Sequence, residues 1–396
     1  SNLLNSELKN EIAYLYKQNN SHVCSTTVPI KFTKIFINNE WHNAELHTTF
    51  AVCDPRTGEE ICQVEESTKV DVDKAVKAAR NAFRNDSEWR KMKAVVRADL
   101  MRKFAEYLRR DIDYLSKLET LNNGKPLEEN KMDITISADC IDYYAGLVGK
   151  IMNETSETRT GSFVHYYHAP IGNTIILKPA EETPLTALYC ASLLKEAGFP
   201  PGVVNVLPGD GSECGQFIVT HEGIDKVFFT GSVEVGGKVQ ELAAKSNVKR
   251  FSLELREKCP LIICEDADLD SAVELTHRTI FADSAQSCFA GSRIFVHEKI
   301  YAQFVIKCVE LTDRRVVGDP FDSKAEQGPQ INDEKFQKTI KYIESGKKQG
   351  AKLECGGERF GTNGFFIRPT VFSNVTDDMD ITSDEVGSVS LNKLDI

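Results

Sequence analysis

The 396-residue sequence lacks the long apolar segments and the excess of positive charge that bring proteins to membranes or nucleic acids. No apolar run approaches the roughly 20 residues that are needed to cross a bilayer. Lysine and arginine together number 48, against 59 aspartates and glutamates, which leaves a formal net charge of −11. Because a surface this negative repels phosphate backbones and anionic lipid heads, we expect no general binding to nucleic acid or to membranes.

Cysteine is present, but without the spacing of metal sites or disulfide frameworks. The eleven cysteines are odd in number and scattered, and no two of them form a C-x-x-C pair. We therefore expect no metal site and no disulfide scaffold. The first twenty residues, SNLLNSELKNEIAYLYKQNN, lack the charged-then-apolar order of a signal peptide, so a cytoplasmic location with reduced thiols is expected.

What is present is the composition of a globular protein with room for two or three domains. Hydrophobic residues make up 41% of the chain and charged residues 27%. From residue 173 onward, short apolar segments alternate with helical patterns, namely NTIILKP, then VVNVL at 203–207 and KVFF at 226–229. Strand, helix and strand in this order, with short connections, predict right-handed crossovers and a parallel sheet, and so an α/β fold.

Helical periodicity also precedes this region. Thr68 and Asp71 are spaced as a capping box, and the residues that follow place one apolar face along the run to Phe83. Leu100 to Leu115 continue a similar spacing in what we interpret as a second helix. Both helices are expected to be scaffold elements.

Ligands of parallel sheets bind beyond the carboxyl ends of the strands, so the polar residues there are candidates for a site. Lys178 and Glu181 follow the first strand and could hold the ribose hydroxyls of a nucleotide, although solvated surface charges are the common alternative. Gly231 and Ser232 follow a strand and open a helix, where unpaired amides can hold a phosphate. A plain tight turn is an equal alternative there, because the sequence has no G-x-G-x-x-G motif.

Two further residues are candidates for covalent chemistry. Glu254 lies in FSLEL between apolar residues that predict burial, which would raise its pKa and let it act as a base, with an exposed strand face as the alternative. Cys288 lies in the small-residue loop AQSCFAGSR, where a stabilised thiolate could be a nucleophile. Its alternative is one more structural thiol among eleven, and no His, Asp or Asn pattern completes a protease-like triad around it.

These segments together resemble the aldehyde dehydrogenase superfamily, and most closely its cytosolic class 1 retinal dehydrogenase branch. The resemblance extends from KIFINNEWH (34–42) to FIRPTVFSNVTDDM (366–379) and includes KEAGFPPGVVNVLPG, KVFFTGSVEVG, RFSLEL and AGSRIFV. It implies a Rossmann-type parallel-sheet cofactor domain and a second α/β catalytic domain, both incomplete in this sequence. It also implies an aldehyde as substrate, NAD as cofactor and a homo-oligomer.

The resemblance assigns roles to individual positions. In the family a cysteine thiolate attacks the aldehyde, hydride passes to NAD, and a glutamate-activated water hydrolyses the thioester. Cys288 matches the nucleophile and Glu254 matches the glutamate base. Lys178 and Glu181 match the residues that hold the adenosine ribose. Gly231 and Ser232 match the turn beside the pyrophosphate, and Glu385 matches the carboxylate that holds the nicotinamide ribose.

The sequence also departs from the family pattern. About two dozen residues are absent after Gly172, where the family has a Rossmann strand and the Asn that donates to the oxyanion. Arg256 and Glu257 replace two glycines beside the nicotinamide, Ala285 replaces a glycine of the cysteine motif, and the sequence ends before the family's last segment. Two hypotheses therefore stay open: an NAD-dependent aldehyde oxidoreductase, impaired and with retinal as one candidate substrate, or a catalytically inactive structural or binding protein of crystallin-like kind.

The same resemblance predicts how the chain is divided. We expect residues 150–170 to form an arm that pairs with another copy of the chain. The absence of a final strand is expected to weaken this homo-oligomer. The predicted parts are an N-terminal tail at 1–33, an NAD-binding domain at 34–149 and 171–256 that lacks one strand-helix segment after Gly172, an oligomerisation arm at 150–170, and a truncated catalytic domain at 257–396.

Overall fold

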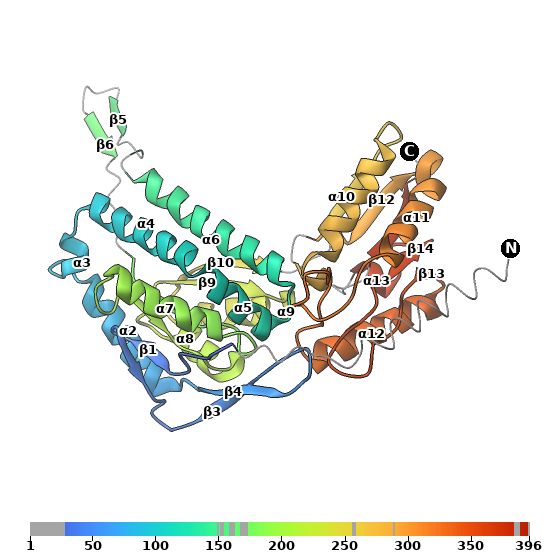
Figure 1. Cartoon of the computed structure of the whole chain (residues 1–396). Coiled ribbons are helices and arrows are strands. Elements are labelled where there is room, and N and C mark those ends of the chain that lie inside the picture. Colours follow the sequence, from blue (N-terminus) through green and yellow to red (C-terminus); the bar gives the residue numbers. More distant parts are fainter. Residues whose placement is uncertain are drawn as a thin grey trace.

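The computed structural model shows two lobes that meet along one side (Figure 1). Residues 28–148, 150, 173–255, 259–287 and 290–382 are described in full, and Ser383 and the strands at 154–157, 163–166 and 389–394 as backbone only. The first lobe comprises the described residues up to Leu255, and the second lobe those from Cys259 onward. Over these described stretches, no helix is long and apolar enough to cross a membrane.

Two pairs of parallel strands form the centre of the first lobe, which confirms the predicted α/β fold. Strand β7 (Ile175–Leu177) pairs with β8 (Val204–Val206), and β9 (Lys226–Gly231) pairs with β10 (Arg250–Leu255). Strand β8 also pairs in antiparallel fashion with β1, which gives the sheet order β2-β1-β8-β7. The remaining strands of this lobe are β1 (Ile35–Ile37), β2 (Glu40–His42), β3 (Thr49–Cys53), β4 (Glu60–Glu65), β5 (Glu154–Glu157) and β6 (Phe163–Tyr166).

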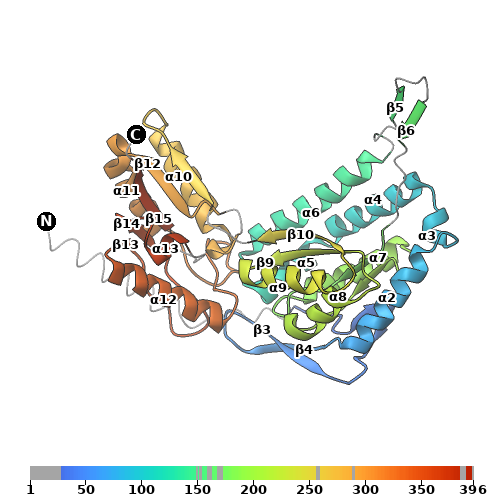
Figure 2. The same ribbon diagram turned by 180° about the vertical axis from the view of Figure 1, so that it is seen from behind.

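Helices cover both faces of the first sheet because its strands bury side chains alternately on either side. Phe36 of β1 belongs to a core formed with α4, α5 and α7, whereas Ile35 and Ile37 belong to a core formed with α2 and α8. Figure 2 shows α2, α8 and α9 on one side of the lobe, with α4 and α6 behind them. The helices are α2 (Lys69–Phe83), α3 (Glu88–Lys91), α4 (Ala94–Arg110), α5 (Ile112–Asn123), α6 (Leu127–Leu147), α7 (Leu185–Ala197), α8 (Gln216–Thr220, preceded by a π-turn at Gly211–Gly215) and α9 (Val233–Ala244).

The helix boundaries follow the predicted local signals. Before α2, the Asp71 carboxylate accepts hydrogen bonds from the backbone N–H and the hydroxyl of Thr68, at 2.9 and 2.8 Å. Helix α7 ends at Gly198, whose φ of 98° is the left-handed conformation that glycine adopts without strain. The capping residues and the C-terminal glycine were therefore correctly identified from the sequence.

The second lobe contains one five-stranded sheet in the order β11-β12-β15-β14-β13. Its first four strands are parallel, and β13 is antiparallel to β14. Val371 and Phe372 are neighbours on β14 and belong to cores on opposite faces, one with α10 and α11 and the other with α12. The elements are β11 (Pro260–Ile263), α10 (Leu269–Phe281), β12 (Arg293–His297), α11 (Glu298–Asp313), α12 (Asp333–Gln349), β13 (Lys352–Cys355), β14 (Val371–Ser373), α13 (Asp380–Ser383) and β15 (Val389–Leu394).

The two parallel pairs of the first lobe are not joined into one sheet by any described strand. Strands β7 and β9 each keep one edge without a partner among the described residues. Apolar side chains on these strands are exposed, by 51% at Ile175, 42% at Leu177 and 65% at Phe228. An open edge flanked by exposed apolar residues is what remains where a strand of a continuous sheet is absent. Strand β7 begins shortly after Gly172, the position at which the sequence predicts that a strand-helix segment is missing.

Three peripheral segments complete the description. The β5–β6 hairpin projects beyond the end of α6 (Figure 1) and falls within the predicted arm at 150–170. Of the predicted tail at 1–33, residues 28–33 are described, and three of them (Val28, Ile30 and Phe32) pack against the core of the first lobe. The β3–β4 hairpin reaches the second lobe, where Arg56 contacts Asp319 at 3.3 Å.

Candidate active site

Lys178 and Glu181 lie together just beyond the carboxyl end of β7. The Lys178 ammonium donates to the Glu181 Oε2 at 3.2 Å and to the carbonyl oxygens of Pro179 and Gly209, both at 2.8 Å. The lysine side chain is largely buried, whereas that of Glu181 is about half exposed. A fixed cation beside an accessible carboxylate can accept and donate hydrogen bonds to a ribose diol. The structure therefore brings this predicted pair together.

Close packing explains why a glycine stands beside this pair. A Cβ added at Gly209 would lie 2.9 Å from the Cβ of Cys214 and 3.3 Å from the backbone nitrogen of Ser67. Only a residue without a side chain lets the turn after β8 approach so closely, and this approach brings the Gly209 carbonyl to Lys178. The turn after β8 is thus part of the same site.

Gly231, Ser232 and Glu254 form a second group at the ends of β9 and β10. The parallel register places Glu254 beside Thr230 and Leu255 beside Gly231. Ser232 is the N-cap of α9, and its hydroxyl accepts a hydrogen bond from the Val235 N–H at 3.2 Å. The free amides of this helix start and its positive end can hold a phosphate.

The predicted burial of Glu254 is wrong. Its side chain is exposed, because β10 pairs only with β9 among the described residues. The exposed strand face, which was the alternative to burial for Glu254, is therefore what the structure shows.

Several predicted residues lie outside the described residues. They are Cys288, Glu385, and the substituted pair Arg256 and Glu257. The chain is described up to Ser287 on the approach to Cys288 and again from Ala290.

The approach to Cys288 contains an unusual backbone turn. After α10, the residues Asp283, Ser284 and Ala285 all have positive φ values, of 53°, 52° and 62°. This is the left-handed region, which costs an L-residue with a side chain about 1–2 kcal/mol. Three such residues in succession persist only where surrounding contacts hold them. Ala285 is the residue that replaces a glycine of the family motif, so the strained conformation occupies that position.

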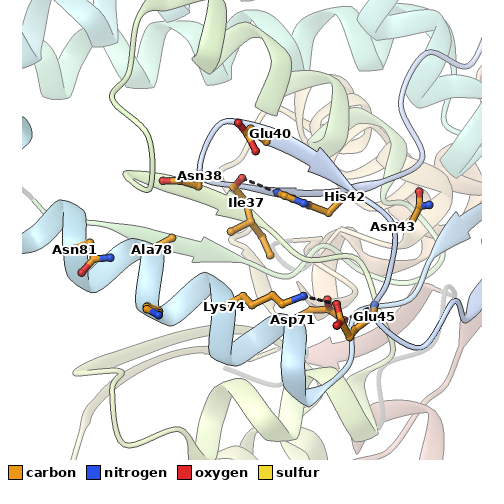
Figure 3. A pocket seen from close by; sticks show the side chains of 11 residues that line it. Ile37, Asn38, Glu40, His42, Asn43, Glu45, Asp71, Lys74, Ala78 and Asn81 are labelled. Atoms are coloured by element: carbon orange, nitrogen blue, oxygen red, sulfur yellow. Dashed lines mark hydrogen bonds and ion pairs between the residues drawn. The ribbon is translucent and has the colours of Figure 1, made fainter.

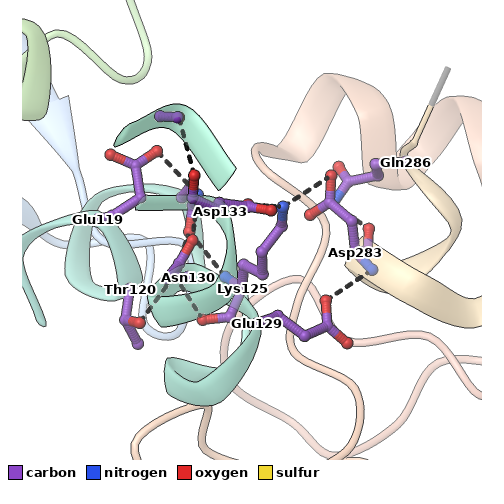
Figure 4. Close-up of polar contacts among 10 residues, drawn as sticks. Glu119, Thr120, Lys125, Glu129, Asn130, Asp133, Asp283 and Gln286 are labelled. Carbon is purple, nitrogen blue, oxygen red and sulfur yellow. Dashed lines mark hydrogen bonds and ion pairs between the residues drawn. The ribbon is translucent and has the colours of Figure 1, made fainter. Parts of the chain in front are cut away.

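Side chains from both lobes hold this turn (Figure 4). The Asp283 N–H donates to the Glu129 carboxylate of α6 at 2.9 Å, and the Lys125 ammonium lies 3.8 Å from the Asp283 carboxylate. The Ser284 hydroxyl donates to the Gly328 carbonyl at 3.0 Å, and Gln330 donates to the Ser284 carbonyl at 3.2 Å. The turn thus rests on the first lobe on one side and on the loop before α12 on the other.

Burial alters the titration of the groups around the turn. It raises the pKa of the Glu129 carboxyl, an effect that the Asp283 N–H and the Lys125 ammonium partly offset. The pKa of Lys125 is raised because its acidic neighbours, Asp283 first, outweigh its burial. No sequence pattern singles out Glu129, because it stands in the first turn of a helix, where acidic residues are common for local reasons.

The described cysteines differ in their capacity to react. Burial raises the pKa of Cys62 to about 11, and those of Cys190, Cys214, Cys308 and Cys355 to about 12. These five thiols are poor nucleophiles near neutral pH. The nine described cysteines form no disulfide, and the described residues hold no cluster of three or more metal-ligating side chains.

A groove of about 370 Å³ lies elsewhere on the first lobe, between the β1–β2 hairpin and α2 (Figure 3). Polar side chains line it, including an ion pair between Lys74 and Glu45. It contains none of the predicted site residues. This groove is therefore separate from the strand ends that carry the candidate site.

The hydrogen-bonding groups at the described strand ends fit a dinucleotide. Glu181 offers an accessible carboxylate beside a fixed ammonium, and α9 offers a capped helix start. A Cβ at Gly236 would lie 2.5 Å from a Leu255 methyl group, so this glycine allows α9 to pack closely on β10. The two groups suit the ribose and the phosphates of one cofactor, respectively.

Comparisons with known proteins show which family the chain resembles. Residues 41–172 and 169–389 match the aldehyde dehydrogenase family. Over 384 residues the chain is 50% identical to retinal dehydrogenase 2 of Mus musculus, covering 90% of this chain and 74% of that protein. It is 48% identical to retinaldehyde dehydrogenase 3 of Homo sapiens, covering 90% of this chain and 75% of that protein.

Solved structures of the same kind are similar in fold. An NAD+ complex of aldehyde dehydrogenase from Bacillus cereus superposes with a TM-score of 0.89 at 38% identity, covering 92% of this chain and 80% of that chain. An NAD+ complex of betaine aldehyde dehydrogenase from Staphylococcus aureus superposes with a TM-score of 0.86 at 30% identity and covers 92% of this chain and 79% of that chain. Sequence and fold thus point to one family.

Proposed function

This chain belongs to the aldehyde dehydrogenase family, and we propose that it catalyses the NAD-dependent oxidation of an aldehyde to a carboxylic acid. The observation that carries the proposal is the Lys178–Glu181 pair at the end of β7, held against Gly209 as a nucleotide site requires. Retinal is the proposed aldehyde, since the similar mouse and human proteins are named for it.

We propose that Cys288 and Glu254 carry out the covalent steps. The Cys288 thiolate attacks the aldehyde carbon, forming a carbon–sulfur bond and an alkoxide. When bound, NAD would be the two-electron oxidant that accepts the hydride. The product is a thioester on Cys288, and a water molecule deprotonated by Glu254 attacks it. The carbon–sulfur bond then breaks, the carboxylic acid leaves and the thiolate is restored.

The chain's other site residues bind and orient the cofactor in this proposal. Lys178 and Glu181 hold the adenosine ribose, Gly231 and Ser232 hold the pyrophosphate at the start of α9, and Glu385 holds the nicotinamide ribose. Replacing Glu181 with Gln keeps its size but removes the charge that fixes Lys178. We expect this change to raise the KM for NAD more than it lowers kcat, because it removes binding rather than chemistry.

The test is NADH formation by folded protein with retinal and with a short aliphatic aldehyde. Turnover that disappears in a Cys288→Ala variant supports the proposal, because only the nucleophile has been removed. Cys264→Ala, which alters an exposed cysteine away from the site, is the matched control and should retain wild-type activity. Turnover that persists in Cys288→Ala would contradict the assignment of the nucleophile.

A second candidate is a catalytically inactive member of the family that binds or supports other molecules. The observation that favours it is the break between β7 and β9, since the absent strand would lie next to both groups of cofactor residues. A folded wild-type protein without turnover, and without saturable NAD binding in calorimetry, would support this candidate. NAD binding without turnover would place the defect in the chemical step.

We also propose a homo-oligomer in the cytoplasm, assembled through the β5–β6 hairpin. Two antiparallel strands project from the body, and among the described residues they pair only with each other, so their outer edges can pair with a second copy. Light scattering after size exclusion should show an assembly of more than one chain. A monomer at all concentrations would contradict the proposed homo-oligomer.

A further inference from the structure

We propose that Glu129 is a positioning residue for Cys288, because it holds the left-handed turn Asp283–Ala285 that carries the chain to that cysteine. The inference rests on the proposed function, in which Cys288 is the nucleophile. Glu129 itself touches none of the reacting atoms in this proposal. Its role is to keep the turn in one conformation.

The backbone conformation of the turn is unfavourable for its residues. Asp283, Ser284 and Ala285 adopt successive left-handed conformations that L-residues avoid, and none of the three is a glycine. Within the turn, the Gln286 backbone N–H donates a hydrogen bond to the Asp283 carbonyl at 2.9 Å. That bond closes the turn, and the Asp283 N–H makes a further contact outside it.

Glu129 of the first lobe contacts this turn of the second lobe. Its carboxylate accepts the Asp283 N–H at 2.9 Å from the first turn of α6 (Figure 4). A hydrogen bond from an N–H to a half-buried carboxylate is stronger than one between neutral groups. Lys125 adds a charge contact at 3.8 Å to the Asp283 side chain, and also donates to Asp133 at 2.5 Å.

The turn is close to the proposed nucleophile in the sequence. Cys288 follows Ala285 by three residues, and the Ile331 N–H donates to the Gln286 side chain at 3.2 Å, which fixes the first of the two residues between them. A change of backbone conformation at Asp283 would redirect every residue that follows. Displacement of a reacting group by about 1 Å can reduce its rate by about 100-fold.

The test measures the rate at which iodoacetamide alkylates Cys288, followed by mass spectrometry of the peptide that contains it. Peptide resolution is needed because Cys53, Cys140 and Cys264 are exposed and can react as well. We expect Glu129→Ala to change the Cys288 rate several-fold, because the reactivity of a thiol follows the surroundings of its thiolate, and these change with the backbone that carries it. Glu129→Gln should restore a rate close to that of the wild type, because its amide oxygen can still accept the Asp283 N–H.

Glu128 provides the matched control. It precedes Glu129 on α6, is exposed, and pairs with Lys131 at 3.0 Å on the helix surface. Glu128→Ala and Glu128→Gln should both leave the Cys288 rate unchanged. An unchanged rate in folded Glu129→Ala, or a Glu129→Gln variant as altered as Glu129→Ala, would overturn the inference.

A second measurement applies even if Glu129→Ala does not fold. Amide hydrogen exchange of the wild-type protein should show protection at Asp283, and this protection should be retained in Glu129→Gln. Exchange at the rate of an open loop in the wild type would overturn the inference. Alkylation and exchange need neither NAD nor aldehyde, so a failed NADH assay would reject the proposed function without affecting these results.

Discussion

At the scale of single residues, burial decides which ionisable groups influence stability. His277 on α10 is buried beside Arg315, whose Nη1 lies 3.3 Å from the His277 Nε2, and its ring packs against Phe281. Burial, assisted by the positive charge of Arg315, lowers the pKa of His277 to about 4. The folded protein therefore keeps this imidazole neutral over most of the pH range in which it is stable.

The expected consequence is a loss of stability in mild acid. Below a pH of about 6.5 the unfolded chain binds a proton at His277 that the folded chain does not bind. The free energy of unfolding should therefore fall between pH 6.5 and pH 4, by at most about 3 kcal/mol from this residue, and then stay constant. His277→Gln should reduce this fall when urea unfolding is followed at several pH values. The exposed His47→Gln variant should retain the wild-type slope.

At the scale of secondary-structure elements, identical substitutions have opposite effects in different places. Gly198 ends α7 with a φ of 98°, whereas Gly237 lies exposed within α9 and has open space where a Cβ would be added. The first position requires a left-handed backbone and the second a helical one. Glycine is favourable at the first position and unfavourable at the second.

Gly198→Ala should therefore destabilise the protein by about 1–2 kcal/mol, because alanine is strained in the left-handed conformation. Gly237→Ala should stabilise it by up to about 1 kcal/mol, because alanine is a better helix former. The two variants control for each other in a thermal or urea unfolding experiment. Two changes of the same sign would contradict the helix boundaries described above.

At the scale of the whole molecule, buried charges connect the two lobes. Arg56 at the tip of the β3–β4 hairpin pairs with Asp54 at 2.7 Å and with Asp319 of the second lobe at 3.3 Å, and its side chain is only 6% exposed. The Arg56 guanidinium also lies over the Phe321 ring. No hydrophobic cluster among the described residues extends from one lobe to the other, so polar contacts such as this one join them.

Removing this cation should weaken the contact between the lobes. Arg56→Ala leaves two partly buried carboxylates without their partner, which typically costs about 3–5 kcal/mol. We expect a lower midpoint of urea unfolding and earlier proteolysis of the β3–β4 hairpin. Arg84→Ala removes an exposed arginine that pairs with Asp86, and should change stability by less than about 1 kcal/mol. Equal effects of the two substitutions would show that Arg56 does not join the lobes.

The structure also shows where sequence patterns fail to predict local structure. The helical spacing from Leu100 to Leu115 predicts one helix, but the structure ends α4 at Arg110 and begins α5 at Ile112. Asp111 between them accepts a hydrogen bond from the Tyr189 hydroxyl at 2.8 Å and pairs with Arg110. Tyr189 lies on α7, so no pattern local to residues 100–115 could have revealed this break.

The sequence by itself determined the α/β class, the parallel strands and the positions of several helix ends. These depend on alternation, capping residues and glycine, which act over a few neighbouring residues and are legible in order along the chain. It also brought Lys178 and Glu181 into one site, because a spacing of three residues after a strand keeps them close. Only the tertiary structure decided the exposure of Glu254, the open edges of β7 and β9, and the contact of Glu129 with the turn before Cys288. Each of these depends on what lies opposite a residue in space, and that partner is distant in the sequence or absent from it.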